Sequence, residues 1–184
     1  MKIEIKKGKK LTISEIDLIN LWRKKEFGSK SLIAPRPGSD DWNKIYFLLK
    51  DTNSNILAFG RIHDVNIEFL GKGYSVFGIA TLIATVKGKG YGSRLLKAQL
   101  AYAKKHGKTA IGFCNKKLSD FYRKRGLTIL ENGAGRFLYK DENDHLHEDP
   151  WGGGDVIYIE AEDELMGLII ANPIEKVISY RQHW

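Results

Sequence analysis

The sequence predicts an α/β (α+β) fold, a mixed and mostly antiparallel sheet flanked by helices, in one domain over residues 1–184. Apolar runs at Ile45–Lys50, Ile56–Phe69 and Tyr74–Ala84 are separated by turn-forming residues, which is typical of an antiparallel meander. A glycine turn, a helical pattern and another short apolar run follow, which is typical of a parallel crossover. A chain of 184 residues fits one domain with an apolar core.

The first elements are a strand over residues 2–6 and a helix with Ser14 as its expected N-cap. Asp17 stands three residues after Ser14 and would complete a partial capping box. The apolar stripe of this helix runs to Phe27, so Gly28 is the expected residue just beyond its C-terminus.

The second half is expected to hold a long helix after the glycine turn, a short helix and three strands, with the short helix over residues 118–124 and the strands over 110–114, 127–130 and 155–160. Residues 29–43 and 132–154 contain Pro, Gly and charged residues and are expected to be loops. The segment 161–184 fits a helix and a strand equally well.

Composition and charge limit the kinds of partner. The net charge of +8 invites a nucleic-acid hypothesis, but the lysines are spread along the chain and no DNA-binding motif or aromatic-basic interleaving is present. We therefore expect no nucleic-acid partner. No apolar run is long enough to span a bilayer, and the N-terminus lacks the apolar core of a signal peptide, so we expect no membrane partner. A single Cys cannot form an internal disulfide, which favours a cytoplasmic setting. We also expect the protein to be a monomer or a homodimer.

The segment Lys87–Gly92 reads Lys-Gly-Lys-Gly-Tyr-Gly and stands between an apolar run and a helical pattern. Glycines permit positive φ and let a ligand approach the backbone closely. Free N–H groups at a helix start favour an anion, and Lys87 and Lys89 add positive charge. The spacing matches neither a P-loop nor the full dinucleotide-binding pattern. We expect a phosphate or pyrophosphate site here, with a purely structural turn as the alternative.

This turn resembles the Arg/Gln-x-x-Gly-x-Gly/Ala signature of the GNAT superfamily of N-acetyltransferases, with Lys87 in place of the Arg or Gln. Further along, Phe121–Leu127 resembles the Phe-Tyr-x-Lys-x-Gly-Phe segment of the same superfamily, with Leu127 for the last Phe. The order of the two segments agrees with the superfamily. The resemblance implies the GNAT fold, acetyl-CoA (coenzyme A) as cofactor, and direct ternary-complex transfer of an acetyl group to a primary amine of a small molecule.

The resemblance also implies the site residues. Backbone N–H groups just before the turn usually polarise the thioester carbonyl in this superfamily. Tyr122 matches a Tyr that lies near the thioester sulfur in many members, which makes it the candidate general acid, although a packing role is the alternative. The expected cofactor-binding residues are Leu82, Ile83, Ala84, Lys87, Gly88, Lys89, Gly90, Tyr91, Gly92, Ser93, Asn115 and Tyr122.

The group that takes the amine proton is open. Glu68 is a candidate catalytic base, acting directly or through water, His63 is another, and an amine that arrives neutral needs no base. Cys114 could carry the acetyl group in a ping-pong mechanism, but we favour a core role for it. His145-x-His147-Glu148-Asp149 has the residue types of a zinc site without a second ligand cluster, so we expect no metal.

Two further segments bear on the acceptor. Asp40-Asp41-Trp42 and Tyr180–Trp184 resemble segments of the aminoglycoside 2′-N-acetyltransferases within the superfamily. That resemblance implies Asp40, Asp41, Trp42 and Trp184 as substrate-binding residues for a polycationic sugar. Ala80 departs from it, because the aminoglycoside enzymes carry an acidic residue there. The alternatives are a peptide or protein amine as acceptor, and an acyl-CoA-binding sensor or interaction module, which Tyr122 in a full motif disfavours.

Overall fold

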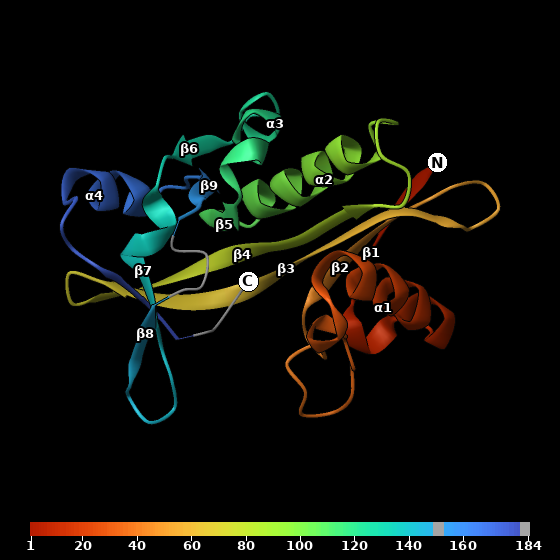
Figure 1. The fold of residues 1–184 in the computed structure, drawn as a ribbon, viewed down its shortest axis with the longest axis horizontal. Coiled ribbons are helices and arrows are strands. Elements are labelled where there is room, and N and C mark those ends of the chain that lie inside the picture. Colours follow the sequence, from red (N-terminus) through yellow and green to blue (C-terminus); the bar gives the residue numbers. More distant parts are fainter. Residues whose placement is uncertain (149–152, 181–184) are drawn as a thin grey trace. The chain divides into compact units, whose positions relative to one another are not determined.

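The structure, a computed structural model, describes residues 1–148 and 153–180 (Figure 1). It divides into two compact units, one made of Met1–His63 and Ala80–Gln99 and the other of Asp64–Ile79 and Leu100–Trp184. Strands β3 (Ile56–Phe69) and β4 (Lys72–Ala84) and helix α2 (Tyr91–Lys105) contribute residues to both units. No helix among the described residues has both the length and the apolar character needed to cross a membrane.

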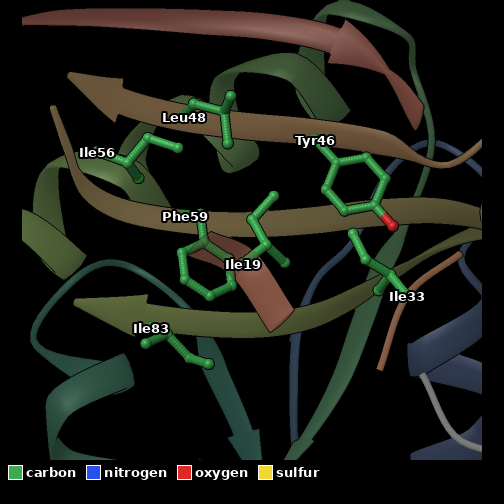
Figure 2. Packing of buried hydrophobic residues seen from close by; sticks show 7 residues of the cluster. All are labelled: Ile19, Ile33, Tyr46, Leu48, Ile56, Phe59 and Ile83. Carbon is green, nitrogen blue, oxygen red and sulfur yellow. The ribbon is translucent and has the colours of Figure 1, made fainter. Parts of the chain in front are cut away.

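In the first unit, helix α1 (Ile13–Phe27) packs on one face of a sheet formed by β1 (Lys2–Lys7), β2 (Ile45–Lys50) and β3. These three strands pair antiparallel, and their register places Leu48 opposite Phe59. Figure 2 shows the resulting core, in which Ile19 of α1 lies among these two side chains and the others of one cluster: Ile33, Tyr46, Ile56 and Ile83. All seven are buried, so this face is an apolar core.

The opposite face of the same sheet is covered by α2. Successive residues of a strand point to opposite faces, so Gly60, next to Phe59, points away from α1. A Cβ atom added at Gly60 would lie 3.2 Å from Leu95 and 2.9 Å from Gln99, both on α2. The absence of a side chain at Gly60 therefore lets α2 pack directly on the backbone of β3.

The start of α1 differs from the sequence prediction. The N-cap is Thr12 rather than Ser14, and Glu15 rather than Asp17 completes the capping box. Glu15 N–H donates to the Thr12 hydroxyl over 3.3 Å, and Thr12 N–H donates to the Glu15 carboxylate over 2.8 Å. Ser14 was a plausible cap by residue type, but Glu15 is buried and held by other partners, which fixes the helix start two residues earlier.

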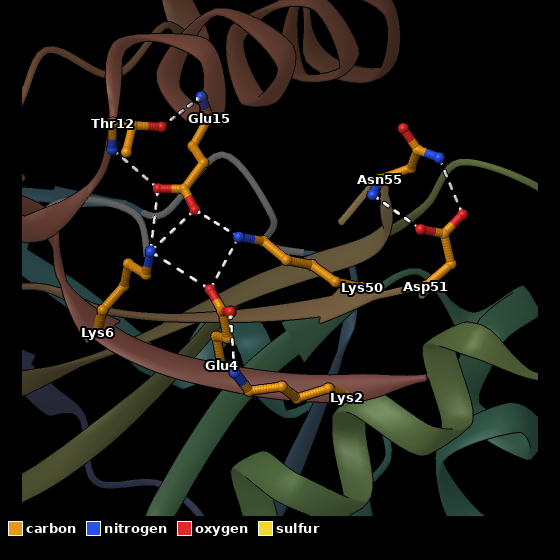
Figure 3. A network of polar contacts seen from close by, with 8 residues as sticks. All are labelled: Lys2, Glu4, Lys6, Thr12, Glu15, Lys50, Asp51 and Asn55. Carbon is orange, nitrogen blue, oxygen red and sulfur yellow. Dashed lines mark hydrogen bonds and ion pairs between the residues drawn. The ribbon is translucent and has the colours of Figure 1, made fainter. Parts of the chain in front are cut away.

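Those partners are lysines on the neighbouring strands (Figure 3). Lys6 and Lys50 each donate to the Glu15 carboxylate over 2.8 Å, and Lys50 also pairs with Glu4 over 2.8 Å. Burial raises the pKa of Glu15, but the hydrogen bonds from Lys50 and Lys6 outweigh it, so the pKa is lowered overall. Lys50 is also the main reason why the pKa of Glu4 falls to about 2. The helix start is thereby joined to two strands.

A matched pair of hydroxyl deletions tests this helix start. Thr12→Ala is expected to lower the free energy of unfolding by about 1 kcal/mol, because it removes the N-cap hydrogen bond. Ser14→Ala deletes an exposed hydroxyl inside the helix and is expected to change the free energy of unfolding by no more than about 0.5 kcal/mol. Urea denaturation followed by circular dichroism measures both, and a larger loss for Ser14→Ala would restore Ser14 as the cap.

The second unit contains a mixed sheet with the strand order β6-β9-β5-β4-β3-β10-β7-β8. Among its described pairs, β4–β5 and β10–β7 are parallel, whereas β5–β9, β6–β9, β3–β10 and β7–β8 are antiparallel. The predicted mixed, mostly antiparallel sheet flanked by helices is confirmed. The remaining elements are β5 (Ala110–Cys114), α3 (Ser119–Arg123), β6 (Thr128–Leu130), β7 (Phe137–Lys140), β8 (Leu146–Glu148), β9 (Asp155–Ile159), α4 (Leu165–Ala171) and β10 (Val177–Ser179).

The loop predicted for residues 132–154 is wrong in part. It contains a short 3₁₀ helix, Gly133–Arg136, and the hairpin β7–β8. β7 forms because its residues pair with β10, which lies far along the chain, and such pairing leaves little trace in the local sequence. The ambiguous C-terminal segment resolves into helix α4 and strand β10.

Candidate active site

The glycine turn lies between β4, which ends at Ala84, and α2, which begins at Tyr91. Gly88 and Gly90 have φ values of +81° and +74°, which favour glycine, and a Cβ atom at either position would meet no atom of the described residues within 4 Å. The turn is exposed, and the first turn of α2 holds no acidic residue. This backbone therefore offers helix-start N–H groups and open space to an anionic ligand.

Thr81, in β4, has a backbone conformation that its sequence does not reveal. Its φ is +53°, which is rare for a β-branched residue and marks local strain. The Thr81 hydroxyl accepts a hydrogen bond from Arg23 of α1, and its carbonyl oxygen would lie 2.8 Å from a Cβ atom at Gly60. β4 is therefore distorted one residue before Leu82–Ala84, the stretch expected to polarise the thioester carbonyl.

In the second unit, Tyr122 lies on α3 and is half-buried. Its ring packs edge-on against Phe121, with ring centroids 5.1 Å apart. Burial raises the pKa of Tyr122 to about 12, and the charge of Cys114 adds to the shift. The phenol therefore remains protonated at neutral pH, as a proton or hydrogen-bond donor must.

Asn115 and Cys114 lie at the end of β5. The exposed Asn115 caps the 3₁₀ turn Lys116–Leu118, with its side-chain oxygen accepting from Lys117 N–H over 3.0 Å. Cys114 is buried, with Sγ 3.7 Å from the Ser119 hydroxyl, and burial raises the pKa of its thiol. A buried thiol with a raised pKa is a poor nucleophile, which favours the core role over an acetyl-cysteine.

The two candidate bases have different surroundings. Glu68, in the part of β3 that belongs to the second unit, is half-buried and accepts a hydrogen bond from the Tyr180 hydroxyl over 2.7 Å. That hydrogen bond raises the pKa of Tyr180. His63, in the first unit, is only 3% exposed. Glu68 is thus the more accessible of the two, with one of its carboxylate oxygens already bonded.

Some of the residues expected to bind a cationic acceptor already have hydrogen-bond or ion-pair partners within the protein. Asp41 accepts hydrogen bonds from Lys44 over 3.1 Å, from Arg61 over 3.0 Å and from the Tyr46 hydroxyl over 3.3 Å. Asp40 is exposed and stands 3.7 Å from Lys44. Trp184 lies outside the described residues, and Trp42 is half-buried in the loop before β2.

The sequence analysis missed Arg23 and Arg61, which meet beside Asp41 and Thr81. No local pattern marks them, because they are brought together from α1 and β3.

The histidine-acidic segment is a hairpin whose imidazoles pair with Asp141. His147 Nε2 lies 2.8 Å and His145 Nδ1 3.7 Å from the Asp141 carboxylate, while Asp149 lies outside the described residues. Within 1–148 and 153–180, no group of three or more His, Cys, Asp or Glu residues is arranged to hold a metal ion.

A mixed sheet with a glycine turn between β4 and α2 places the chain in the class of coenzyme A-dependent acyltransferases. Residues 16–127 match the model of the acetyltransferase (GNAT) family, and the chain therefore belongs to that family, whose members use acetyl-CoA. No curated protein matches the sequence.

Solved structures agree with this fold. Escherichia coli ElaA is 16% identical with a TM-score of 0.57, and the match covers 87% of this chain and 100% of that one. An acyl-CoA N-acyltransferase from Pseudomonas aeruginosa is 18% identical with a TM-score of 0.54, covering 85% of this chain and 99% of that one. The E. coli GNAT N-acetyltransferase YhbS, solved in complex with CoA, is 11% identical with a TM-score of 0.55, covering 97% and 87%. At these identities the likeness concerns the fold alone.

Proposed function

We propose that this acyltransferase moves the acetyl group of acetyl-CoA directly to the primary amine of a small molecule. The glycine turn carries the proposal. Its two positive-φ glycines and exposed backbone lie at the start of α2, inside the segment that matches the family. Such a turn suits the pyrophosphate of acetyl-CoA, which supplies the acetyl group as a reactive thioester.

The remaining residues then have distinct tasks. Backbone N–H groups of Leu82–Ala84, beside the strained Thr81, hold and polarise the thioester carbonyl. Tyr122 donates to the leaving sulfur, and Glu68 receives the amine proton directly or through water. Cys114 takes no part, because its thiol is buried.

The acceptor is a separate question. An aminoglycoside would need free carboxylates, and Asp41 is already paired with the two cations Lys44 and Arg61 and accepts a hydrogen bond from the Tyr46 hydroxyl. Asp40 beside it is exposed, but it too lies close to a cation, 3.7 Å from Lys44. An acceptor with less positive charge than an aminoglycoside is therefore favoured.

Two assays test the proposal together. Acetyl-CoA binding is measured by isothermal titration calorimetry, and release of free thiol from acetyl-CoA is measured across aminoglycosides, polyamines, amino acids and short peptides. We expect binding and turnover with at least one small amine. Binding without turnover on any amine would instead identify an acyl-CoA sensor, and an absence of binding would refute the proposed cofactor site.

A further inference from the structure

We propose that the acceptor amine also carries a carboxylate, as an α-amino acid does, and that Arg23 and Arg61 bind this carboxylate. The inference rests on the proposed acetyl transfer and names the class of its acceptor. It starts from a cluster in the first unit, where three cations, Arg23, Lys44 and Arg61, surround the half-buried carboxylate of Asp41, with the exposed Asp40 beside Lys44.

The cluster lies on the face of the sheet that α1 covers. Arg61 of β3 stands directly opposite Tyr46 of β2, two residues along from the pair that packs under Ile19. Arg23 comes from α1 itself and donates to the carbonyl of Ser31 over 2.5 Å and to the hydroxyl of Thr81. Arg61 is therefore next to the apolar core, beside Tyr46, which Figure 2 labels.

Positive charge exceeds negative charge in this cluster. Arg23 and Lys44 are 7% and 8% exposed, and the side chain of Arg61 is 11% exposed. Asp41 pairs with Lys44 and Arg61, and Asp40 lies 3.7 Å from Lys44, but within the described part of the chain Arg23 has no carboxylate at ion-pair distance. Burial lowers the pKa of Arg23 to about 10, and the charge of Arg61 adds to that shift, so Arg23 is still charged at neutral pH. Surplus buried charge is costly, and an incoming anion would relieve it.

Arg61 also has an unsatisfied hydrogen-bond donor. Its Nε atom is buried and has no hydrogen-bond partner among the described residues, which is unusual for a donor inside a protein. A guanidinium offers parallel N–H groups that match the two oxygens of a carboxylate. The same cluster would repel a polycationic sugar, so the charge balance favours an acceptor that carries a carboxylate.

The position of the cluster separates the acceptor from the phosphates of the cofactor. Arg23 bonds to Thr81, immediately before the stretch expected to hold the thioester carbonyl. Three further residues of strand, at about 3.3 Å each, carry the chain away to Ala84 before the turn to the glycines begins. The cluster thus lies at the acyl end of β4 rather than at its phosphate-binding end.

The first arm of the test changes the acceptor. Thiol release is measured with glycine, L-alanine, L-methionine and L-glutamate and with the carboxamide of each. We expect kcat/KM to be at least about tenfold higher for the acids, because each carboxylate gains charge-assisted hydrogen bonds. Amine basicity cannot produce this preference, since the amides hold their amines neutral at lower pH than the acids do.

The second arm changes the protein. Arg61→Gln is expected to raise KM for the preferred acid about tenfold or more, with the KM of its amide and the affinity for acetyl-CoA unchanged. Arg61→Lys keeps the charge without the fork, and a partial effect is expected. Arg36→Gln, at an exposed arginine of the same unit, is the control and should behave as the parent. Thermal unfolding confirms that each variant is folded.

The outcomes are distinct. Equal or faster turnover of the amides would overturn the inference, as would turnover of other amines alone. A loss of acetyl-CoA affinity in Arg61→Gln would also overturn it and assign the cluster to a cofactor phosphate. If the parent binds no acetyl-CoA at all, the proposed function fails first and the inference fails with it.

Discussion

Replacing Tyr122 by Phe is expected to lower kcat for acetyl transfer by about a hundredfold or more, because a positioned acid contributes about 10²–10⁴ in rate. The substitution removes one oxygen from a half-buried ring that packs against Phe121, so little packing is lost. KM for acetyl-CoA should stay within about threefold of the parent, since the hydroxyl is proposed to act on the leaving sulfur in the transition state rather than on the bound cofactor.

The pKa of Tyr122 refines this role. Burial raises it to about 12, whereas an ordinary cysteine thiol has a pKa of about 8.5. The phenol is thus the weaker acid, and a complete proton transfer from it to a thiolate would be uphill. In the proposed mechanism we therefore expect Tyr122 to stabilise the leaving sulfur by a hydrogen bond, or to give its proton to the sulfur only as the proton released by the amine reaches the phenol oxygen. Because a group with a pKa of about 12 stays protonated up to pH 10, kcat should show no fall from Tyr122 between pH 7 and 10.

Tyr139→Phe is the matched control. Tyr139 is another half-buried tyrosine of the second unit, and it stacks on His147 with centroids 5.8 Å apart. Steady-state thiol release from pH 6 to 10 compares the two variants with the parent. Full activity in Tyr122→Phe, or an equal loss in both variants, would remove Tyr122 from the chemistry and leave it a packing residue.

The sequence was sufficient where the chemistry is local. Glycine is the residue type that most readily adopts a positive φ, so a turn with positive φ could be predicted at Gly88 and Gly90, and the structure has both in that conformation. Likewise, apolar runs bounded by turns predicted β2, β3 and β4, because alternation and turn chemistry act over a few residues. The start of α1 was two residues off, since Thr12 and Ser14 are both good caps and distant lysines decide between them.

Features that depend on contacts between distant parts of the chain could not be predicted from the sequence. The positive φ of Thr81 occurs inside strand β4, and a Thr in a strand gives no hint of it. Asp41 looked like a free carboxylate because its partners Arg61 and Tyr46 come from two strands that follow it in the chain. The same folding brings Arg23 beside them, so the surplus of positive charge is visible only in three dimensions.

Replacing Gly90 by Ala is expected to weaken acetyl-CoA binding by at least about tenfold, or about 1.4 kcal/mol. The φ of +74° at Gly90 costs a residue with a side chain about 1–2 kcal/mol of strain. The new methyl group meets no atom of the described residues within 4 Å, so backbone strain is the expected cost to the fold. In the complex the same methyl group would occupy space that the ligand needs beside the backbone.

Gly71→Ala separates these two effects. Gly71 has a φ of +71° and equally open surroundings, but it lies in the turn between β3 and β4 and belongs to no proposed site. Both variants should lose Tm alike, by about 2–4 °C for each kcal/mol of strain, as thermal unfolding measures. Calorimetry should then show weaker acetyl-CoA binding for Gly90→Ala alone. Equal affinities for acetyl-CoA in the two variants would mean that the turn before α2 has only a structural role and that the pyrophosphate binds elsewhere.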